Sequence, residues 1–99
     1  MAYKIRKSKE FLNNVLTILA YIEKEWGIKS SEKFQTILDS KIDSLSIHPK
    51  IGRAITRNKH IRKLMITKHN KIYYKIRHNE IIILTLFESK QNPNRNKYE

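Results

Sequence analysis

The sequence predicts an α+β domain in which an N-terminal helical hairpin packs on a small, mainly antiparallel sheet. Residues 8–47 carry two stretches whose apolar residues recur three and four positions apart, which is the pattern of amphipathic helices. Residues 61–88 carry three strand-like runs whose connections are short enough for hairpins only. A short strand at residues 3–6 precedes the helices. The expected order is therefore β-α-α-β-β-β.

The first helix is expected from Ser8 to about Trp26. Ser8 is an N-cap residue by type and position, and Gly27 supplies the left-handed residue that commonly ends a helix. The apolar positions form one stripe, which we expect to be buried. They are Phe11, Leu12, Val15, Leu16, Ile18, Leu19, Ile22 and Trp26.

The second helix is expected to begin at Ser30 or Ser31. It should end at His48, because the residue before a proline disfavours the helical conformation. Residues 49–54 are expected to form a loop. The apolar stripe of this helix consists of Phe34, Ile37, Leu38, Ile42 and Leu45.

Three strands are expected at about 61–67, 71–77 and 81–88. The last one is apolar at nearly every position, so we expect an interior strand that is covered on both sides. Side chains alternate between the two faces of a strand, so the middle strand should have an apolar and a basic face. The apolar face carries Ile72, Tyr74 and Ile76, and the basic face carries Lys71, Tyr73, Lys75 and Arg77.

The charge of the chain indicates an anionic partner. Its 21 Lys and Arg residues exceed the 9 Asp and Glu residues and give a net charge of +12. Such a field attracts polyanions, with nucleic acid first, an acidic protein second and an anionic membrane surface third. No cysteine is present, which excludes disulfides, thiolate zinc sites and cysteine nucleophiles. Without a signal-peptide core or a membrane-spanning run, we expect one cytoplasmic domain over residues 1–99, with a basic tail from about residue 89.

The basic sheet face is the leading candidate site. A solvated face of lysines that discourages aggregation is the alternative, but the net charge favours phosphate binding. Tyr73 is expected to stack on a base. The residues expected to bind nucleic acid are Arg53, Arg57, Lys63, Tyr73, Lys75, Arg77 and Arg95.

Other chemistry is less well supported by the sequence. The four histidines show no metal-binding spacing, so no metal site is expected. His60 is a candidate general base, although exposed turn histidines are more often only solvated. No paired carboxylates, phosphate-binding loop or nucleotide fingerprint occur, so no cofactor is expected.

Four segments resemble the RelE/ParE toxins of type II toxin–antitoxin modules in their order and spacing. They are His48–Arg53, Ile61–Leu64, Lys71–Ile76 and Ile83–Pro93. The resemblance covers essentially the whole chain. It implies a small basic toxin that is neutralised by an acidic antitoxin, which is encoded adjacently and forms a hetero-oligomer with it.

The resemblance implies two alternative targets. RelE-like members cut messenger RNA on the ribosome by attack of the ribose 2′-hydroxyl on the adjacent phosphate, without a metal. ParE-like members instead poison DNA gyrase. By position, the resemblance places phosphate-binding cations at Arg62, Lys71 and Lys90 and a proton-transfer group at Tyr98, whereas Leu64 stands where the family has a second cation. The sequence thus favours RNA cleavage, and the alternatives are gyrase poisoning and a non-toxic nucleic-acid-binding module.

Overall fold

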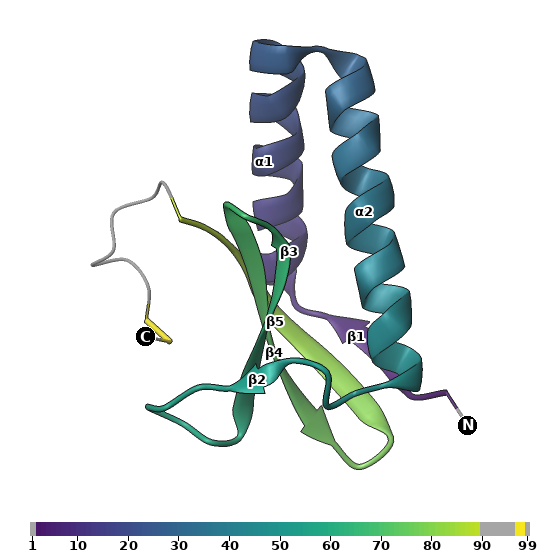
Figure 1. Cartoon of the computed structure of the whole chain (residues 1–99), viewed down its shortest axis with the longest axis vertical. Helices are drawn as coiled ribbons and strands as arrows, with labels where there is room; N and C mark the ends of the chain where they lie inside the picture. Colours follow the sequence, from purple (N-terminus) through teal and green to yellow (C-terminus); the bar gives the residue numbers. More distant parts are fainter. Residues whose placement is uncertain (1, 90–96, 99) are drawn as a thin grey trace.

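The computed structural model describes residues 2–89 and 97–98 and confirms the predicted α+β fold (Figure 1). Two helices pack on a mixed sheet of five strands. In chain order, the elements are β1 (Lys4–Lys7), α1 (Lys9–Trp26), α2 (Ile28–Ile47), β2 (Arg53–Ala54), β3 (Ile61–Thr67), β4 (Asn70–Arg77) and β5 (Glu80–Glu88).

The strands lie in the order β1-β5-β4-β3-β2. β1 is parallel to β5, and the other three pairings are antiparallel, so the prediction of a mainly antiparallel sheet is confirmed. Parallel strands need a crossover, which the helical hairpin supplies. The prediction of a loop over residues 49–54 was wrong in part. Arg53 and Ala54 form the short strand β2 opposite Lys63 and Arg62, and two residues are too few to give a periodic signal.

The start of α1 is fixed to the sheet by Ser8. Its hydroxyl oxygen accepts the backbone N–H of Phe11 at 3.0 Å, as an N-cap does. The same hydroxyl donates to the carbonyl of Leu84 in β5 at 2.7 Å. The predicted N-cap is therefore confirmed, and it also holds the helix against the sheet.

A single residue, Gly27, joins the two helices. Its φ of 96° lies in a region that glycine adopts without a Cβ clash. The prediction that α2 begins at Ser30 or Ser31 was wrong, because Gly27 flanks both helices and α2 already starts at Ile28. The predicted end is confirmed, since His48 is the C-cap of α2.

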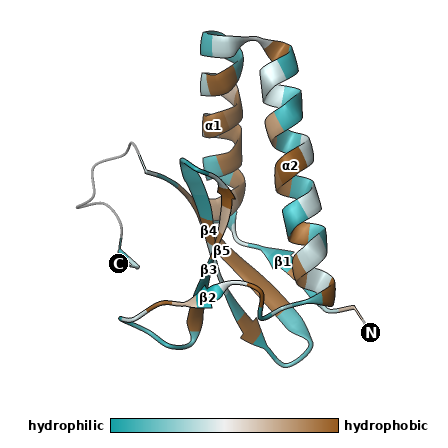
Figure 2. Ribbon diagram, in the orientation of Figure 1, coloured by the Kyte–Doolittle hydropathy of each residue, from teal (hydrophilic) through white to brown (hydrophobic). Residues whose placement is uncertain are grey.

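The core lies between the hairpin and one face of the sheet, and Figure 2 shows apolar residues along β5 and the facing sides of the helices. The far end of the hairpin extends beyond the sheet (Figure 1). The expectation that the whole stripe of α1 is buried was wrong at Leu12, Leu16 and Trp26, which are exposed, and only Trp26 lies at this far end. The buried core comprises Phe11, Ile18, Phe34, Leu38, Ile42, Leu45, Ile66, Ile72, Tyr74, Ile81, Ile83 and Leu86.

The interior position of β5 is confirmed, but its two sides differ. Ile81 and Ile83 are fully buried against the helices. Ile82 and Leu84, on the same strand, are only half-buried, so the expectation of complete cover on both sides was wrong. The second face of the sheet is therefore only partly covered. Over the residues that the structure describes, neither helix is long and apolar enough to cross a membrane.

Candidate nucleic-acid interface

The sheet face opposite the helices, which we call the outer face, can be traced from the strand register. Residues opposite each other on paired strands point to the same side of the sheet. Lys63 lies opposite Arg53 on one side and opposite Tyr73 on the other. Further along β4, Lys71 lies opposite Met65 and Phe87. The predicted cations Arg53, Lys63 and Lys71 therefore share this face.

Lys75 and Arg77 continue the outer face along β4. Ile72, Tyr74 and Ile76 on the same strand pack in or against the core, which confirms the predicted alternation. The register between β4 and β5 shifts between Tyr73 and Tyr74, so that Tyr73 lies opposite Thr85 and Tyr74 lies opposite Ile83. The basic face predicted for this strand is thus present as a surface.

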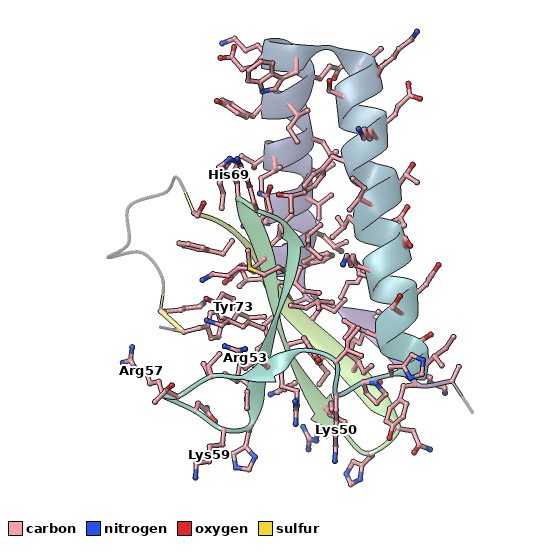
Figure 3. The ribbon with its side chains drawn as sticks, in the orientation of Figure 1. Lys50, Arg53, Arg57, Lys59, His69 and Tyr73 are labelled. Atoms are coloured by element: carbon pink, nitrogen blue, oxygen red, sulfur yellow. The ribbon has the colours of Figure 1, made fainter. Side chains whose placement is uncertain are left out.

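Tyr73 does not offer an exposed ring, contrary to the expectation that it stacks on a base. Its side chain is fully buried, and its ring stacks on that of Tyr98 with the centroids 4.9 Å apart. Figure 3 shows Tyr73 pointing to the side where the C-terminal residues lie, with Arg53 on the same side. The sequence gives no periodic signal for a contact between positions so distant in the chain.

Lys71 lies beside Tyr73 in this aromatic pair. The Lys71 ammonium is 5.6 Å from the Tyr73 ring and 5.7 Å from the Phe87 ring, within the range of cation–π attraction. Burial is the main cause that raises the pKa of Tyr98, while the nearby charge of Lys97 lowers it. The Tyr98 phenol therefore keeps its proton at neutral pH, which suits a proton donor and not a base.

The C-terminal residues are also linked to the first turn of α1. The Lys97 ammonium is 2.9 Å from the Glu10 carboxylate. The hydrogen bond from Lys97 lowers the pKa of Glu10, and the same hydrogen bond raises the pKa of Lys97. Both side chains are substantially exposed, so this ion pair contributes little to stability. Lys97 directly precedes Tyr98, so the pair lies next to the Tyr73–Tyr98 stack in the chain.

Arg62 does not join the other predicted cations. It lies opposite Tyr74, not Tyr73, so it points to the helix side of the sheet. Its guanidinium donates to the carbonyl of Gly52 at 2.7 Å and to that of Lys50 at 3.4 Å. Arg62 therefore holds the loop between α2 and β2, and it is on the opposite face from Lys71.

Tyr74, which lies opposite Arg62 and points to the same face of the sheet, also binds this loop. Its hydroxyl accepts the Gly52 N–H at 2.9 Å and donates to the Pro49 carbonyl at 2.7 Å. Burial raises the pKa of Tyr74, which keeps this hydroxyl a donor. A Cβ at Gly52 would lie 2.5 Å from the Tyr74 hydroxyl, so the position requires glycine. We call the contacts of Arg62 and Tyr74 with the loop from Pro49 to Gly52 the loop anchor.

The remaining predicted residues divide into three groups. Arg57 lies on the exposed loop before β3 (Figure 3) and helps to line a hollow of about 320 Å³ together with Tyr98 and Ile61. Lys90 and Arg95 lie outside the residues that the structure describes. His60 is exposed at the start of β3. Within residues 2–89 and 97–98, no three histidine, aspartate or glutamate residues come together in a way that could hold a metal ion.

Sequence reasoning missed two cations of the outer face, Lys4 and Arg6. Their strand runs beside β5, where Lys4 lies opposite Glu80 and Arg6 opposite Ile82. Ile5, between them, packs against the core. The alternation of basic and apolar residues at positions 4 to 6 is a signal for this placement, but only the parallel pairing with β5 brings it to the basic face.

The fold and this surface define a small, basic α+β protein with cations on one face of its sheet. A family model described as the ParE toxin of type II toxin–antitoxin systems, parDE, matches residues 5–93. The chain therefore belongs to the ParE toxin family, and it is the toxin component of a type II module. This assignment also supports an antitoxin as its partner.

Solved structures agree with the family assignment in their fold. A chain of the chromosomal ParDE system from P. aeruginosa matches with a TM-score of 0.76 at 13% identity, covering 88% of this chain and 96% of that one. A copper-bound mutant toxin from Helicobacter pylori matches with a TM-score of 0.64 at 18% identity, covering 87% and 93%. A conserved protein of H. pylori in solution gives 0.58 at 20% identity, with the same coverage. No curated protein sequence matches the chain.

Proposed function

We propose that this toxin acts by binding and that its target is DNA gyrase. The observation that supports this most is the position of Arg62, which donates to the Gly52 carbonyl at 2.7 Å on the opposite face from Lys71. RNA cleavage would need cations that converge on one phosphate as its charge increases in the transition state. A surface of separated cations instead suits stoichiometric binding to a large anionic target, such as gyrase with its DNA.

The outer face supplies the binding surface in this proposal. Arg53, Lys63, Lys71 and Lys75 present positive charge on adjacent strands, and the helices leave this side uncovered. The antitoxin would neutralise the toxin by laying an acidic segment over the same cations. Charge complementarity of this kind also speeds association, which suits an inhibitor that must bind its toxin quickly.

Ribosome-dependent cleavage of messenger RNA is the second candidate. One observation favours it, since the Tyr73 ring brings Lys71 and Tyr98 close to each other. A cation beside a protonated phenol could stabilise a phosphate and donate a proton. This candidate requires a base and a further cation from elsewhere.

The two candidates are separated by direct assays with the purified full-length chain. Under the gyrase proposal, the toxin inhibits supercoiling by purified gyrase in proportion to its concentration and leaves messenger RNA on programmed ribosomes intact. Catalytic cleavage of that RNA at a small fraction of the ribosome concentration, with supercoiling unaffected, would overturn the proposal. Incorporation of labelled precursors in cells also separates the two candidates. Under the gyrase proposal, DNA synthesis should stop before protein synthesis.

A further inference from the structure

A hollow lies where β1 runs beside the turn between β4 and β5. It has a volume of about 470 Å³, and all six residues that line it are of charged or polar types. The lining residues are Lys4, Arg6, Arg77, His78, Asn79 and Glu80. None of them belongs to the set that the loop anchor or the Tyr73–Tyr98 stack uses.

The strand register arranges the cations of this hollow in two columns. Glu80 on β5 lies between Lys4 on β1 and Arg77 on β4. In the next row of the same face, Ile82 lies between Arg6 and Lys75. Neighbouring strands are about 4.8 Å apart, so the columns on β1 and β4 are roughly 10 Å apart with β5 as the floor between them.

The charge in the hollow is not balanced by the residues around it. Glu80 is its one carboxylate, and it contacts Arg6 at 3.5 Å. This contact is long, and the Arg6 side chain is 69% exposed, so the pair is weak. Across residues 2–89 and 97–98, the structure records no acidic partner for Lys4 or Arg77. Three permanent cations therefore face one carboxylate.

Backbone hydrogen bonds fix the strand and the turn that carry these side chains. The N–H of Lys4 donates to the carbonyl of Asn79 at 2.9 Å and ties the start of β1 to the turn. The turn itself contains only His78 and Asn79, and His78 has a φ of 57°, a left-handed conformation that histidine tolerates better than most residues. A tight turn of this kind keeps Arg77 directly opposite Glu80. With the backbone fixed, only the side chains have to be ordered when a ligand binds.

We propose that this hollow is a binding site for the phosphodiester backbone of a nucleic acid. Two columns of cations can contact, from both sides, the phosphates of one backbone laid along β5, and Arg6 and Arg77 can each hold a phosphate in bidentate fashion. An acidic peptide is a poorer fit, because the six lining residues include no large apolar side chain of the kind that anchors a peptide. The site extends the outer face beyond Lys75 onto β1.

One residue of the site, Glu80, should weaken the binding of an anion. Glu80 occupies the floor between the cations, where its carboxylate repels a phosphate. Replacing it by the isosteric amide should therefore strengthen nucleic-acid binding, whereas loss of the surrounding cations should weaken it.

The experiment is fluorescence anisotropy of a labelled short DNA duplex, with single-stranded RNA in a parallel series, titrated with the full-length chain over a range of salt concentrations. The variant Lys4→Gln/Arg6→Gln/Arg77→Gln should bind at least about tenfold more weakly, and its salt slope should fall by about 2 to 3, as expected for three lost phosphate contacts. Glu80→Gln should bind several-fold more tightly. A loss confined to the duplex or to the RNA identifies which backbone the site takes.

The matched control is Lys24→Gln/Lys29→Gln/Lys33→Gln, which removes the same charge from exposed positions near the end of the helical hairpin. It should leave affinity and salt slope close to those of the wild type. Equal losses in both triple variants, or weaker binding by Glu80→Gln, would overturn the proposal. Binding to poly-glutamate but to neither nucleic acid would overturn it in favour of an acidic protein partner. Lys4→Gln alone serves if the triple variant fails to fold, and it should reduce the salt slope by about 1.

This inference does not depend on the proposed gyrase target. Failure of the supercoiling assay with intact salt-dependent binding would reject the target and leave the site. Inhibition of gyrase by the triple variant with unchanged potency, together with unchanged nucleic-acid binding, would reject the site and leave the target.

Discussion

Tyr73 and Tyr74 are adjacent in the sequence and equally buried, but they serve opposite faces of the sheet. Tyr74 points to the helix side and, through two hydrogen bonds, holds the loop between α2 and β2. Tyr73 points to the outer face and is covered by the ring of Tyr98. The two side chains are thus equally buried for different reasons. Tyr74 is buried within the core, whereas the burial of Tyr73 depends on residues at the end of the chain.

The two faces also use their arginines and lysines differently. On the helix side, Arg62 is part of the loop anchor. On the outer face, Lys63 and Lys71 lie among other cations on open strands. We therefore expect substitutions in the loop anchor to lower stability and substitutions on the outer face to lower binding. The predictions below test this division, starting with the largest expected effect.

Gly52→Ala should have the largest effect on stability. The new methyl group would lie 2.5 Å from the Tyr74 hydroxyl and 2.8 Å from the Lys63 carbonyl, so the loop must move and give up its hydrogen bond. We expect a loss of about 3 kcal/mol in the free energy of unfolding, measured by chemical denaturation. Gly27→Ala is the comparison, since a Cβ there meets nothing within 4 Å, and only its positive φ opposes the change. A smaller loss at Gly52 than at Gly27 would contradict the steric account.

Tyr74→Phe should be next in size. It leaves the N–H of Gly52 and the carbonyl of Pro49 without the hydroxyl that satisfies them. Loss of a buried hydrogen bond with an unsatisfied partner predicts about 2 kcal/mol, measured by the same denaturation. As pH rises into the range where tyrosines ionise, the phenylalanine variant should also lose less stability than the wild type. Because burial raises the folded pKa of Tyr74, its contribution is complete below the unfolded value and is lost as pH rises through the folded one.

Arg62→Gln should lower stability by about 1.5 kcal/mol, because a charge-assisted hydrogen bond to the Gly52 carbonyl is lost. Nucleic-acid affinity should change little at a temperature where the variant is folded. Lys71→Gln is its matched partner on the outer face, and we expect the reverse result, with stability retained and affinity reduced. An affinity loss for Arg62→Gln as large as that for Lys71→Gln would return Arg62 to the binding site.

The smallest expected effect concerns the Glu10–Lys97 pair. The hydrogen bond from Lys97 lowers the folded pKa of Glu10, so the pair contributes at pH values above the unfolded pKa and its contribution disappears as pH falls through the folded one. In an NMR titration, Lys97→Gln should raise the pKa of the Glu10 carboxyl towards its ordinary value. An unchanged pKa would show that Lys97 does not hold the end of the chain to α1 in solution.

The sequence predicts the fold well because the fold depends on local patterns. The spacing of apolar residues defines both helices, and alternation along residues 71–77 separates the two faces of β4. The site is harder to predict, since it depends on pairings between distant segments. The neighbour of Arg62 across the strand pair decides which face it reaches, and Tyr73 is buried by a ring 25 positions later in the chain. Neither fact has a periodic signature.

The outer face of the sheet is the surface on which the toxin acts in this account, and one growth experiment tests that directly. The variant Lys63→Gln/Lys71→Gln/Lys75→Gln is induced in cells without antitoxin, beside Lys24→Gln/Lys29→Gln/Lys33→Gln, and the Tm of both purified chains is measured. We predict that the outer-face variant no longer arrests growth although its Tm stays close to that of the wild type, whereas the hairpin variant remains toxic. Full growth arrest by the outer-face variant would contradict the account.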